Sequence, residues 1–146
     1  MPDHVLKLPA TFEAYARAAG DLRRMLEGRG IGLKPRYNAE LVFEEIVSNI
    51  IRHGCSDHVK CAIEIGLRFE DDAIVMSFQD NAPPFDPRTY VLPELPRTLE
   101  SASNGGLGLL LVSKASQRIE YEYTRQSKNH LTVTIALAGA VSAAAG

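Results

Sequence analysis

Residues 40–54 of this 146-residue chain constrain its fold and chemistry more than any other segment. Their apolar residues repeat at the spacing of a buried helix stripe: Leu41, Val42, Ile46 and Ile50. Glu45 and Asn49 lie one turn apart at the edge of this stripe. A carboxylate and a carboxamide in this arrangement can hold a hydrated divalent cation, and the carboxylate can accept a proton from a nucleophile. As an isolated pair they are more typical of a solvated helix margin, so other parts of the chain have to decide between the two interpretations.

Composition and charge exclude several classes of protein. Hydrophobic residues make up 45% and charged residues 23%, as in ordinary globular domains, and we expect a single domain over residues 1–146 with a tail from about 138. The net charge of −2 gives no general attraction to polyanions, so we expect no nucleic acid partner. No apolar run approaches the roughly 20 residues that span a bilayer, and none near the N-terminus resembles a signal peptide. We therefore expect no membrane contact and a cytoplasmic location.

The order of predicted elements indicates an α+β fold. The patterns predict strands over residues 5–8, 59–69, 73–79, 118–125 and 130–137, and helices over residues 11–27, 35–53 and 106–115. Consecutive strand pairs favour antiparallel pairing, and helices separated from the strands in the sequence favour a separate layer. We expect a two-layer sandwich of a mixed, mostly antiparallel sheet with helices on one face.

Asp80 stands where an apolar strand gives way to a long loop. The loop over residues 80–104 holds five prolines and little periodicity, and long loops in compact domains are usually functional or mobile. An isolated aspartate in this position most often bonds its own backbone in a turn. A carboxylate at the floor of a pocket can instead accept a hydrogen bond from an exocyclic amino group such as that of adenine, and it would disfavour guanine.

A glycine-rich segment, Gly105-Gly-Leu-Gly-Leu109, precedes the last predicted helix. Glycines directly before a helix let backbone amides approach an anion, with support from the helix dipole. No Gly-Lys-Ser/Thr follows, so this is not a Walker A loop. On its own the segment fits a flexible hinge equally well. Together with Glu45, Asn49 and Asp80, it favours a nucleotide site.

The two cysteines, Cys55 and Cys61, are six residues apart, and no Cys or His cluster of zinc-site spacing accompanies them. Cys61 falls on the inward side of a predicted strand, together with Ile63, Ile65 and Leu67. A reduced packing thiol is the better interpretation for a cytoplasmic protein, although the spacing also permits a disulfide.

The joint order of these motifs resembles the Bergerat ATP-binding fold shared by gyrase, heat-shock chaperones, sensor histidine kinases and mismatch-repair ATPases. Within it, the chain is most similar to the small stand-alone anti-sigma-factor serine kinases of bacteria. The resemblance covers the chain from about Val5 to Leu137. The shared segments are Asn49-Ile-Ile-Arg-His-Gly54, Pro84-Phe-Asp-Pro87, Gly105-Gly-Leu-Gly-Leu-x-Leu-Val112 and Asn129-x-Leu131.

The resemblance implies a role for each matching residue. It makes Asn49 the magnesium ligand, Glu45 the base that activates the attacking hydroxyl, and Asp80 the adenine anchor. The segment 88–104 would form the lid over ATP. The remaining expected nucleotide-binding residues are Arg52, His53, Ala82, Pro84, Phe85, Gly105, Gly106, Leu107, Gly108, Leu109 and Asn129. As isolated residues, Arg52 and His53 would equally suit the basic end of a helix.

One position departs from the family pattern. The Asp-x-Gly motif reads Asp80-Asn-Ala82, so a methyl group replaces the glycine hydrogen. If this position needed a positive φ, alanine would cost roughly 1 kcal/mol of backbone strain, and otherwise it narrows the pocket slightly.

The resemblance implies an ATP- and magnesium-dependent protein serine kinase. It would phosphorylate a small anti-sigma-factor antagonist protein and bind a sigma factor. The resemblance also allows a homodimer. The alternative is a non-catalytic protein-interaction switch that binds ATP without turnover, towards which Ala82 points weakly.

Overall fold

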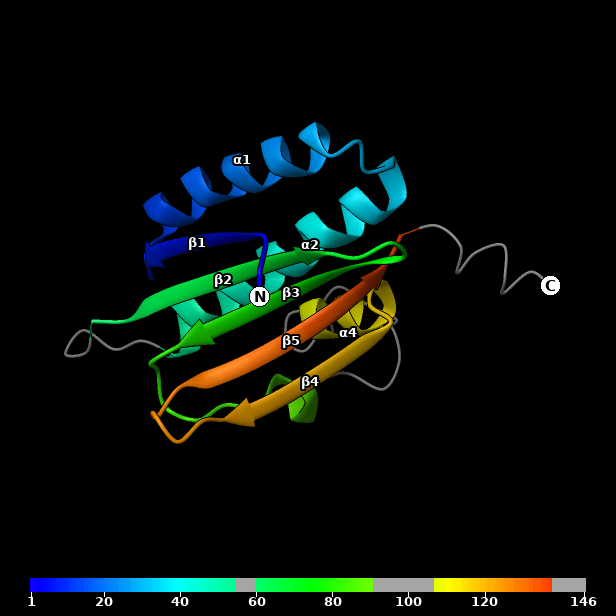
Figure 1. The fold of residues 1–146 in the computed structure, drawn as a ribbon. Helices are drawn as coiled ribbons and strands as arrows, with labels where there is room; N and C mark the ends of the chain where they lie inside the picture. Colours follow the sequence, from blue (N-terminus) through cyan, green and yellow to red (C-terminus); the bar gives the residue numbers. More distant parts are fainter. Residues whose placement is uncertain (55–59, 91–106, 138–146) are drawn as a thin grey trace.

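The fold consists of one five-stranded sheet with helices packed against one of its faces (Figure 1). The structure is a computed structural model and describes residues 1–54, 60–90 and 107–137. Its strands are β1 (His4–Pro9), β2 (Ala62–Phe69), β3 (Ala73–Asp80), β4 (Arg118–Tyr123) and β5 (Asn129–Ala136). The α-helices of the described ranges are α1 (Phe12–Gly28), α2 (Leu33–Asn49) and α4 (Leu107–Ala115). The predicted α+β sandwich is confirmed.

The strand order is β1-β2-β3-β5-β4, and each of the four pairings is antiparallel. The expectation of a mixed sheet is therefore wrong for the described strands. After β3 the chain passes through α4 to the outer edge strand β4, and the β4–β5 hairpin then places β5 beside β3 in the opposite direction. This arrangement puts Asp80 at the end of β3 directly opposite Asn129 at the start of β5.

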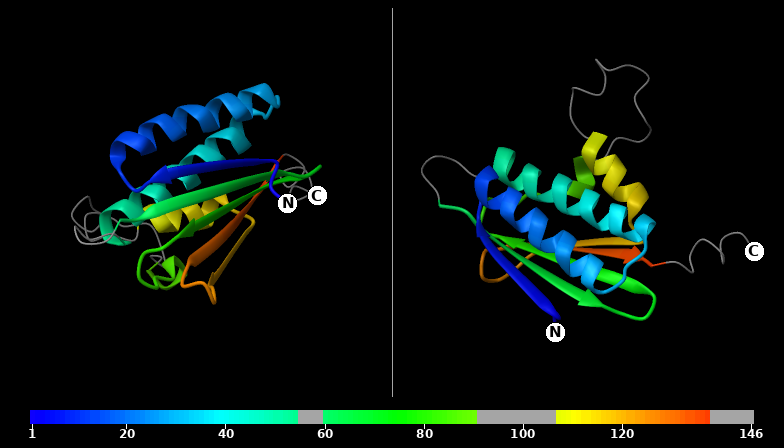
Figure 2. Two further views of the ribbon diagram at one scale, coloured as in Figure 1. Left: turned by 60° about the vertical axis from the view of Figure 1, so that its left-hand side comes forward. Right: turned by 90° about the horizontal axis from the view of Figure 1, so that it is seen from above.

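All three helices lie on the same side of the sheet, as the view from above shows (Figure 2). Alternation along the strands points apolar side chains towards this layer and leaves the other face polar. The fully buried core joins strand residues such as Ile65, Met76 and Val133 to Leu26 and Phe43 of the helices.

Local sequence explains the start of α1. Thr11 is the N-cap, and its hydroxyl accepts a hydrogen bond of 3.1 Å from the backbone N–H of Ala14. This bond satisfies one of the free amides of the first helical turn. The predicted helix over residues 11–27 is confirmed.

The predicted second helix is wrong at its C-terminal end. Helix α2 ends at Asn49, and Ile50–Gly54 forms a π-helical turn. A π turn holds more residues than an α turn, so the side chains after Asn49 are rotated away from the positions that a continuous α-helix would give them. This rotation affects Arg52, which was expected to face the phosphates.

The predicted last helix is confirmed as α4, but its buried residues differ from the predicted ones. Leu109, Leu110 and Val112 are buried, whereas Leu111 is half-buried, although it was expected inside. The side chain of Leu107 lies outside the described part of the structure.

Cys61 is disulfide-bonded, which corrects the expectation of a reduced thiol. Burial alone did not distinguish the two states, because a small buried sulfur fits the inward position of a strand in either form. The other cysteine of the sequence, Cys55, lies outside the described residues, as does the predicted tail from residue 138. Within the described ranges, none of the helices has the length and apolar character needed to cross a membrane.

Candidate functional site

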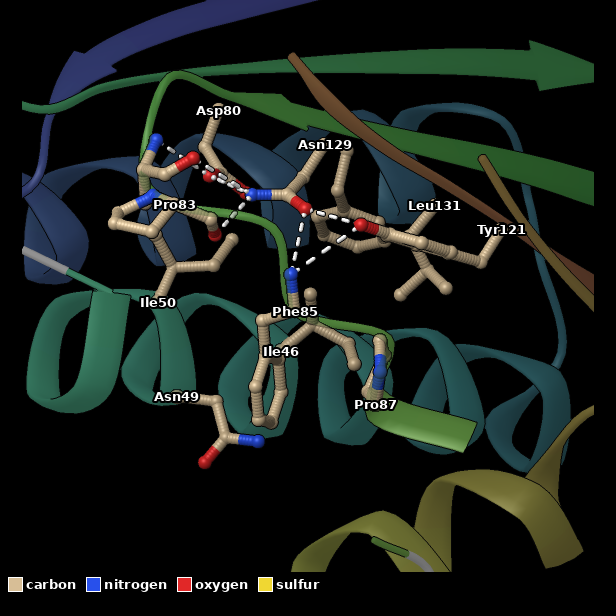
Figure 3. A pocket seen from close by; sticks show the side chains of 12 residues that line it. Ile46, Asn49, Ile50, Asp80, Pro83, Phe85, Pro87, Tyr121, Asn129 and Leu131 are labelled. Carbon is tan, nitrogen blue, oxygen red and sulfur yellow. Dashed lines mark hydrogen bonds between the residues drawn. The ribbon is translucent and has the colours of Figure 1, made fainter. Parts of the chain in front are cut away.

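A pocket opens between the C-terminal half of α2 and the ends of β3, β5 and β4 (Figure 3). The space between its walls that atoms leave empty is about 470 Å³, and part of that space is open to solvent. Its lining is mostly apolar, with polar groups at one end: Ile46, Asn49, Ile50, Phe78, Asp80, Ala82, Pro83, Phe85, Pro87, Tyr121, Asn129 and Leu131.

Asp80 forms part of the pocket wall and is only 5% exposed. Its Oδ1 accepts hydrogen bonds from the backbone N–H of Ala82 at 3.0 Å and from Nδ2 of Asn129 at 2.9 Å. Burial raises the pKa of the Asp80 carboxyl, and these two hydrogen bonds oppose the rise. Asp80 therefore stabilises its own turn through Oδ1, as the first interpretation expects, and it also lines the pocket; its contact with adenine stays a prediction.

Asn129 is the centre of a hydrogen-bond network at the polar end of the pocket (Figure 3). Its Nδ2 donates to Asp80 Oδ1, to the carbonyl of Ala82 at 3.1 Å and to the carbonyl of Pro83 at 3.0 Å. Its Oδ1 accepts from the backbone N–H of Phe85 at 3.0 Å and from the hydroxyl of Tyr121. The side chain thus ties the segment 80–85 to strands β4 and β5.

Ala82 adopts an ordinary backbone conformation. Among the described residues other than glycine, Ser127 alone has a positive φ, so the expected possibility of strain at Ala82 is wrong. The residue is 3% exposed and its side chain lines the pocket. The methyl group therefore affects the shape of the pocket and not the backbone.

Glu45 lies against the first turn of α4, beside Gly108. A Cβ atom on Gly108 would stand 2.7 Å from Cδ of Glu45 and closer still to its Oε2, so glycine is what permits this approach. A carboxylate near a helix N-terminus is favoured by the helix dipole. Burial and the neighbouring Glu44 raise the pKa of Glu45, and Arg52 opposes the rise. A raised pKa is typical of groups that transfer protons.

Asn49 lines the pocket one turn beyond Glu45, and its amide points away from the Asp80–Asn129 network (Figure 3). Within the part of the chain that the structure describes, its side chain makes no hydrogen bond. It is half-buried, so its oxygen is free to meet a ligand. In the same described ranges, no group of three or more His, Cys, Asp or Glu side chains could hold a metal ion. A Mg²⁺ site that depends on a single protein oxygen together with phosphate oxygens and water needs no such group.

The structure does not bring every expected residue to the pocket. Arg52 is exposed, and its guanidinium lies 5.7 Å from the centre of the Phe12 ring at the start of α1. Pro84 is exposed, and Pro83 lines the pocket in its place. Leu109 lines a smaller neighbouring cavity with Ile46 and Leu131 and is not part of the lining of the pocket itself.

Other expected site residues lie outside the described part. Gly105 and Gly106 fall in the range 91–106, outside the described residues, together with most of the predicted lid over residues 88–104. His53 belongs to the π-helical turn, but its side chain is outside the described residues.

Sequence reasoning missed Tyr121, which contributes both a ring and a hydroxyl to the pocket. The strand register contains the signal that could have found it. Tyr121 pairs with Leu131 on β5, and Leu131 pairs with Phe78 on β3, so all three point towards the helices beside Asp80 and Asn129.

Residues 8–135 match the family described as the histidine kinase-like ATPase domain. The chain belongs to this family. Among curated proteins, this ATPase domain is 32% identical over 110 residues to the serine/threonine-protein kinase BtrW of Bordetella bronchiseptica. The matched residues cover 71% of this chain and 77% of the relative. The family and this relative confirm the predicted fold class, ATP as the cofactor, and protein serine/threonine kinase activity.

Solved structures share the fold of this ATPase domain. A chain of the SiaB–SiaC complex from Pseudomonas aeruginosa superposes with a TM-score of 0.63 at 17% identity, over 92% of this chain and 90% of that chain. A Mycobacterium tuberculosis structure of the RsbU and RsbW domains of Rv1364c gives a TM-score of 0.59 at 17% identity. It covers 92% of this chain and 32% of that longer chain.

Proposed function

We propose that this ATPase domain is an anti-sigma-factor kinase that phosphorylates a serine of a small antagonist protein. The observation that supports this proposal most strongly is the placement of Glu45 and Asn49 one helical turn apart, beside a pocket whose polar end presents Asp80. The named relative is a serine/threonine kinase, and structural neighbours include a two-protein complex and an RsbU–RsbW chain.

Asp80 and the apolar walls of the pocket bind the adenine base. Asp80 offers a carboxylate oxygen to the exocyclic amino group of adenine, whereas guanine presents an oxygen at that position and is disfavoured. Pro83, Phe85 and Pro87 line the pocket beside the site of the base.

Glu45 acts as the general base. Its carboxylate accepts the proton of the substrate serine hydroxyl while the serine oxygen forms a bond to the γ-phosphorus. The bond from the γ-phosphorus to the β–γ bridging oxygen breaks, and ADP leaves with that oxygen. Most of the rate comes from positioning and charge stabilisation, because this chemistry needs no covalent enzyme intermediate.

Asn49 would hold Mg²⁺ through its side-chain oxygen. When bound, Mg²⁺ neutralises negative charge on the phosphate oxygens. Gly105, Gly106, Leu107 and Gly108 supply the phosphate-facing turn. Arg52 and His53 remain predicted phosphate-end residues, and Arg52 would have to leave Phe12 to reach the phosphates.

The partners of the chain are also part of this proposal. Besides the antagonist, the same domain binds a sigma factor in the cytoplasm, and residues 1–146 act as one domain. A homodimer is supported by the edge position of β1, where Val5 is 45% exposed and a second copy can pair.

The proposal is tested by transfer of label from γ-³²P-ATP to a candidate antagonist encoded beside this chain. We expect the label on a serine of the antagonist, with Glu45→Ala as the inactive control. If ATP binds but no label moves, the non-catalytic interaction switch is the better account. The ordinary backbone of Ala82 removes the strain that had favoured that alternative.

A further inference from the structure

The hydrogen bonds of the Asn129 amide fix which way round it stands. Its NH₂ end faces the Asp80 carboxylate and two backbone carbonyls, which only accept. Its oxygen end faces the backbone N–H of Phe85 and the hydroxyl of Tyr121. A flipped amide would place its oxygen against three acceptors and its NH₂ against a donor, so the observed orientation is the one that these partners stabilise.

Tyr121 closes the oxygen side of this network. Its hydroxyl donates to Asn129 Oδ1 and accepts from the backbone N–H of Phe85 at 3.3 Å. The three groups form a closed triangle in which each polar atom faces another polar atom of the chain (Figure 3). The Tyr121 ring meanwhile lines the pocket as an apolar wall.

One polar atom at this end is left for a ligand. Asp80 uses Oδ1 for Asn129 and Ala82, and its Oδ2 has no hydrogen-bond partner in the described part of the chain. No buried side-chain polar atom among the described residues lacks a partner, so Oδ2 is open to the pocket. The pocket therefore offers an acceptor to the base, while the donors of Asn129 and Tyr121 are already engaged.

We infer that Tyr121 is a specificity-determining positioning residue, whose hydroxyl holds Asn129 so that the Asp80–Asn129 end of the pocket presents the Asp80 acceptor and, among the described residues there, no free side-chain donor to the base. The inference rests on the proposed ATP-binding function. A base with an exocyclic amino group fits this arrangement, and a base with a carbonyl oxygen in that position does not. Without the Tyr121 hydroxyl, Oδ1 of Asn129 loses one of its two hydrogen-bond donors. The amide is then held less firmly in the orientation that directs its NH₂ to Asp80.

The test compares Tyr121→Phe with Tyr123→Phe. Tyr123 lies two residues along the same strand, faces the same side, and is 42% exposed, so its variant removes the same hydroxyl chemistry outside the network. Calorimetry gives the dissociation constants for ATP and GTP, and thermal unfolding confirms that each variant is folded. We expect Tyr121→Phe to weaken ATP binding about fivefold and to narrow the preference for ATP over GTP. Tyr123→Phe should leave both unchanged.

The ratio of the dissociation constants for GTP and ATP distinguishes the possible results. A purely structural role for Tyr121 would lower stability or weaken both nucleotides equally, and an unchanged ATP-to-GTP ratio in Tyr121→Phe overturns the inference. If the wild type binds neither nucleotide, both the proposed function and this inference are overturned. If the wild type prefers ATP and Tyr121→Phe keeps that ratio, the inference alone fails.

Discussion

The two ends of the candidate site are built differently. At the base end, Asp80, Asn129 and Tyr121 come from three strands and are joined by hydrogen bonds to one another and to the segment 82–85. At the phosphate end, Glu45 and Asn49 come from one helix, and the defining contact is the close approach of Glu45 to Gly108. The base end is thus organised by the folded chain itself, which pre-orders recognition before any ligand arrives.

The difference suggests separate roles for the two ends. Changes at the base end should alter affinity and selectivity, since the groups described there are bonded to one another and leave Asp80 Oδ2 as the acceptor for a ligand. At the phosphate end, changes of Glu45 should alter the rate, because Glu45 acts only when a hydroxyl and a phosphate are both present, whereas changes of Asn49 should alter the part of ATP affinity that depends on Mg²⁺. The following variants test that division.

The largest effect is expected for Glu45→Gln. It keeps the shape of the side chain and removes the base, so phosphotransfer should fall roughly 10²- to 10⁴-fold while ATP affinity stays close to wild type. Single-turnover transfer and calorimetry measure the two quantities. Because burial and Glu44 raise the pKa of Glu45, wild-type activity should decline on acidification at a higher pH than for an ordinary glutamate. Glu44→Gln is the matched control, and a fully active Glu45→Gln would contradict the assigned role.

Asp80→Asn should weaken ATP binding roughly 10- to 100-fold, the range for loss of a hydrogen bond to a charged group. Stability should not fall with it. Burial raises the pKa of Asp80 above its unfolded value, so the ionised carboxylate is disfavoured by folding at neutral pH, and that cost is relieved as pH falls through the folded pKa. A neutral amide can still accept from Asn129 and Ala82. Thermal unfolding at neutral pH checks this, and a large drop in Tm would show that the charge is structural.

Gly108→Ala should lower the phosphotransfer rate about tenfold, with a smaller effect on ATP affinity, because the new methyl group displaces the Glu45 carboxylate. The contact can be isolated with a double-mutant cycle against Glu45→Ala. Once Glu45 is shortened, Gly108→Ala should raise stability by about 1 kcal/mol through helix propensity. Gly28→Ala, where a Cβ meets nothing within 4 Å, is the control. A Gly108→Ala effect that is the same in both backgrounds would place the role of this glycine elsewhere.

The smallest effect is expected for Ala82→Gly. The backbone at Ala82 is unstrained, so glycine brings no relief and should lower stability by about 0.4–1 kcal/mol through a freer unfolded chain. ATP affinity should stay within roughly twofold, because the change removes a single methyl group from the lining. Chemical denaturation and calorimetry measure these quantities. A large gain in affinity would mean that the methyl group obstructs the base.

The sequence was informative wherever a local rule governs the structure. Thr11 predicted a helix start because a threonine oxygen caps a free amide, and alternation placed Ile63, Ile65 and Leu67 inside. Asp80 and Asn129 were found by motif, and the structure brings them into contact.

The misses all depend on geometry that no short pattern contains. Tyr121 reaches the pocket only through the register of β4 on β5. Arg52 turns towards Phe12 because α2 ends in a π turn. The oxidised state of Cys61 depends on a second sulfur and not on the burial of the strand position.

The most direct test of the account is a calorimetric titration of the wild type and of Asn49→Ala with ATP, in the presence and absence of Mg²⁺. We expect the wild type to bind Mg²⁺–ATP much more tightly than GTP, and Asn49→Ala to lose the part of the affinity that depends on Mg²⁺. The base end should remain intact in Asn49→Ala, so weak metal-independent binding with the same preference for ATP should persist. No binding by the wild type at millimolar ATP, or equal Mg²⁺-dependent binding by both proteins, would contradict the account.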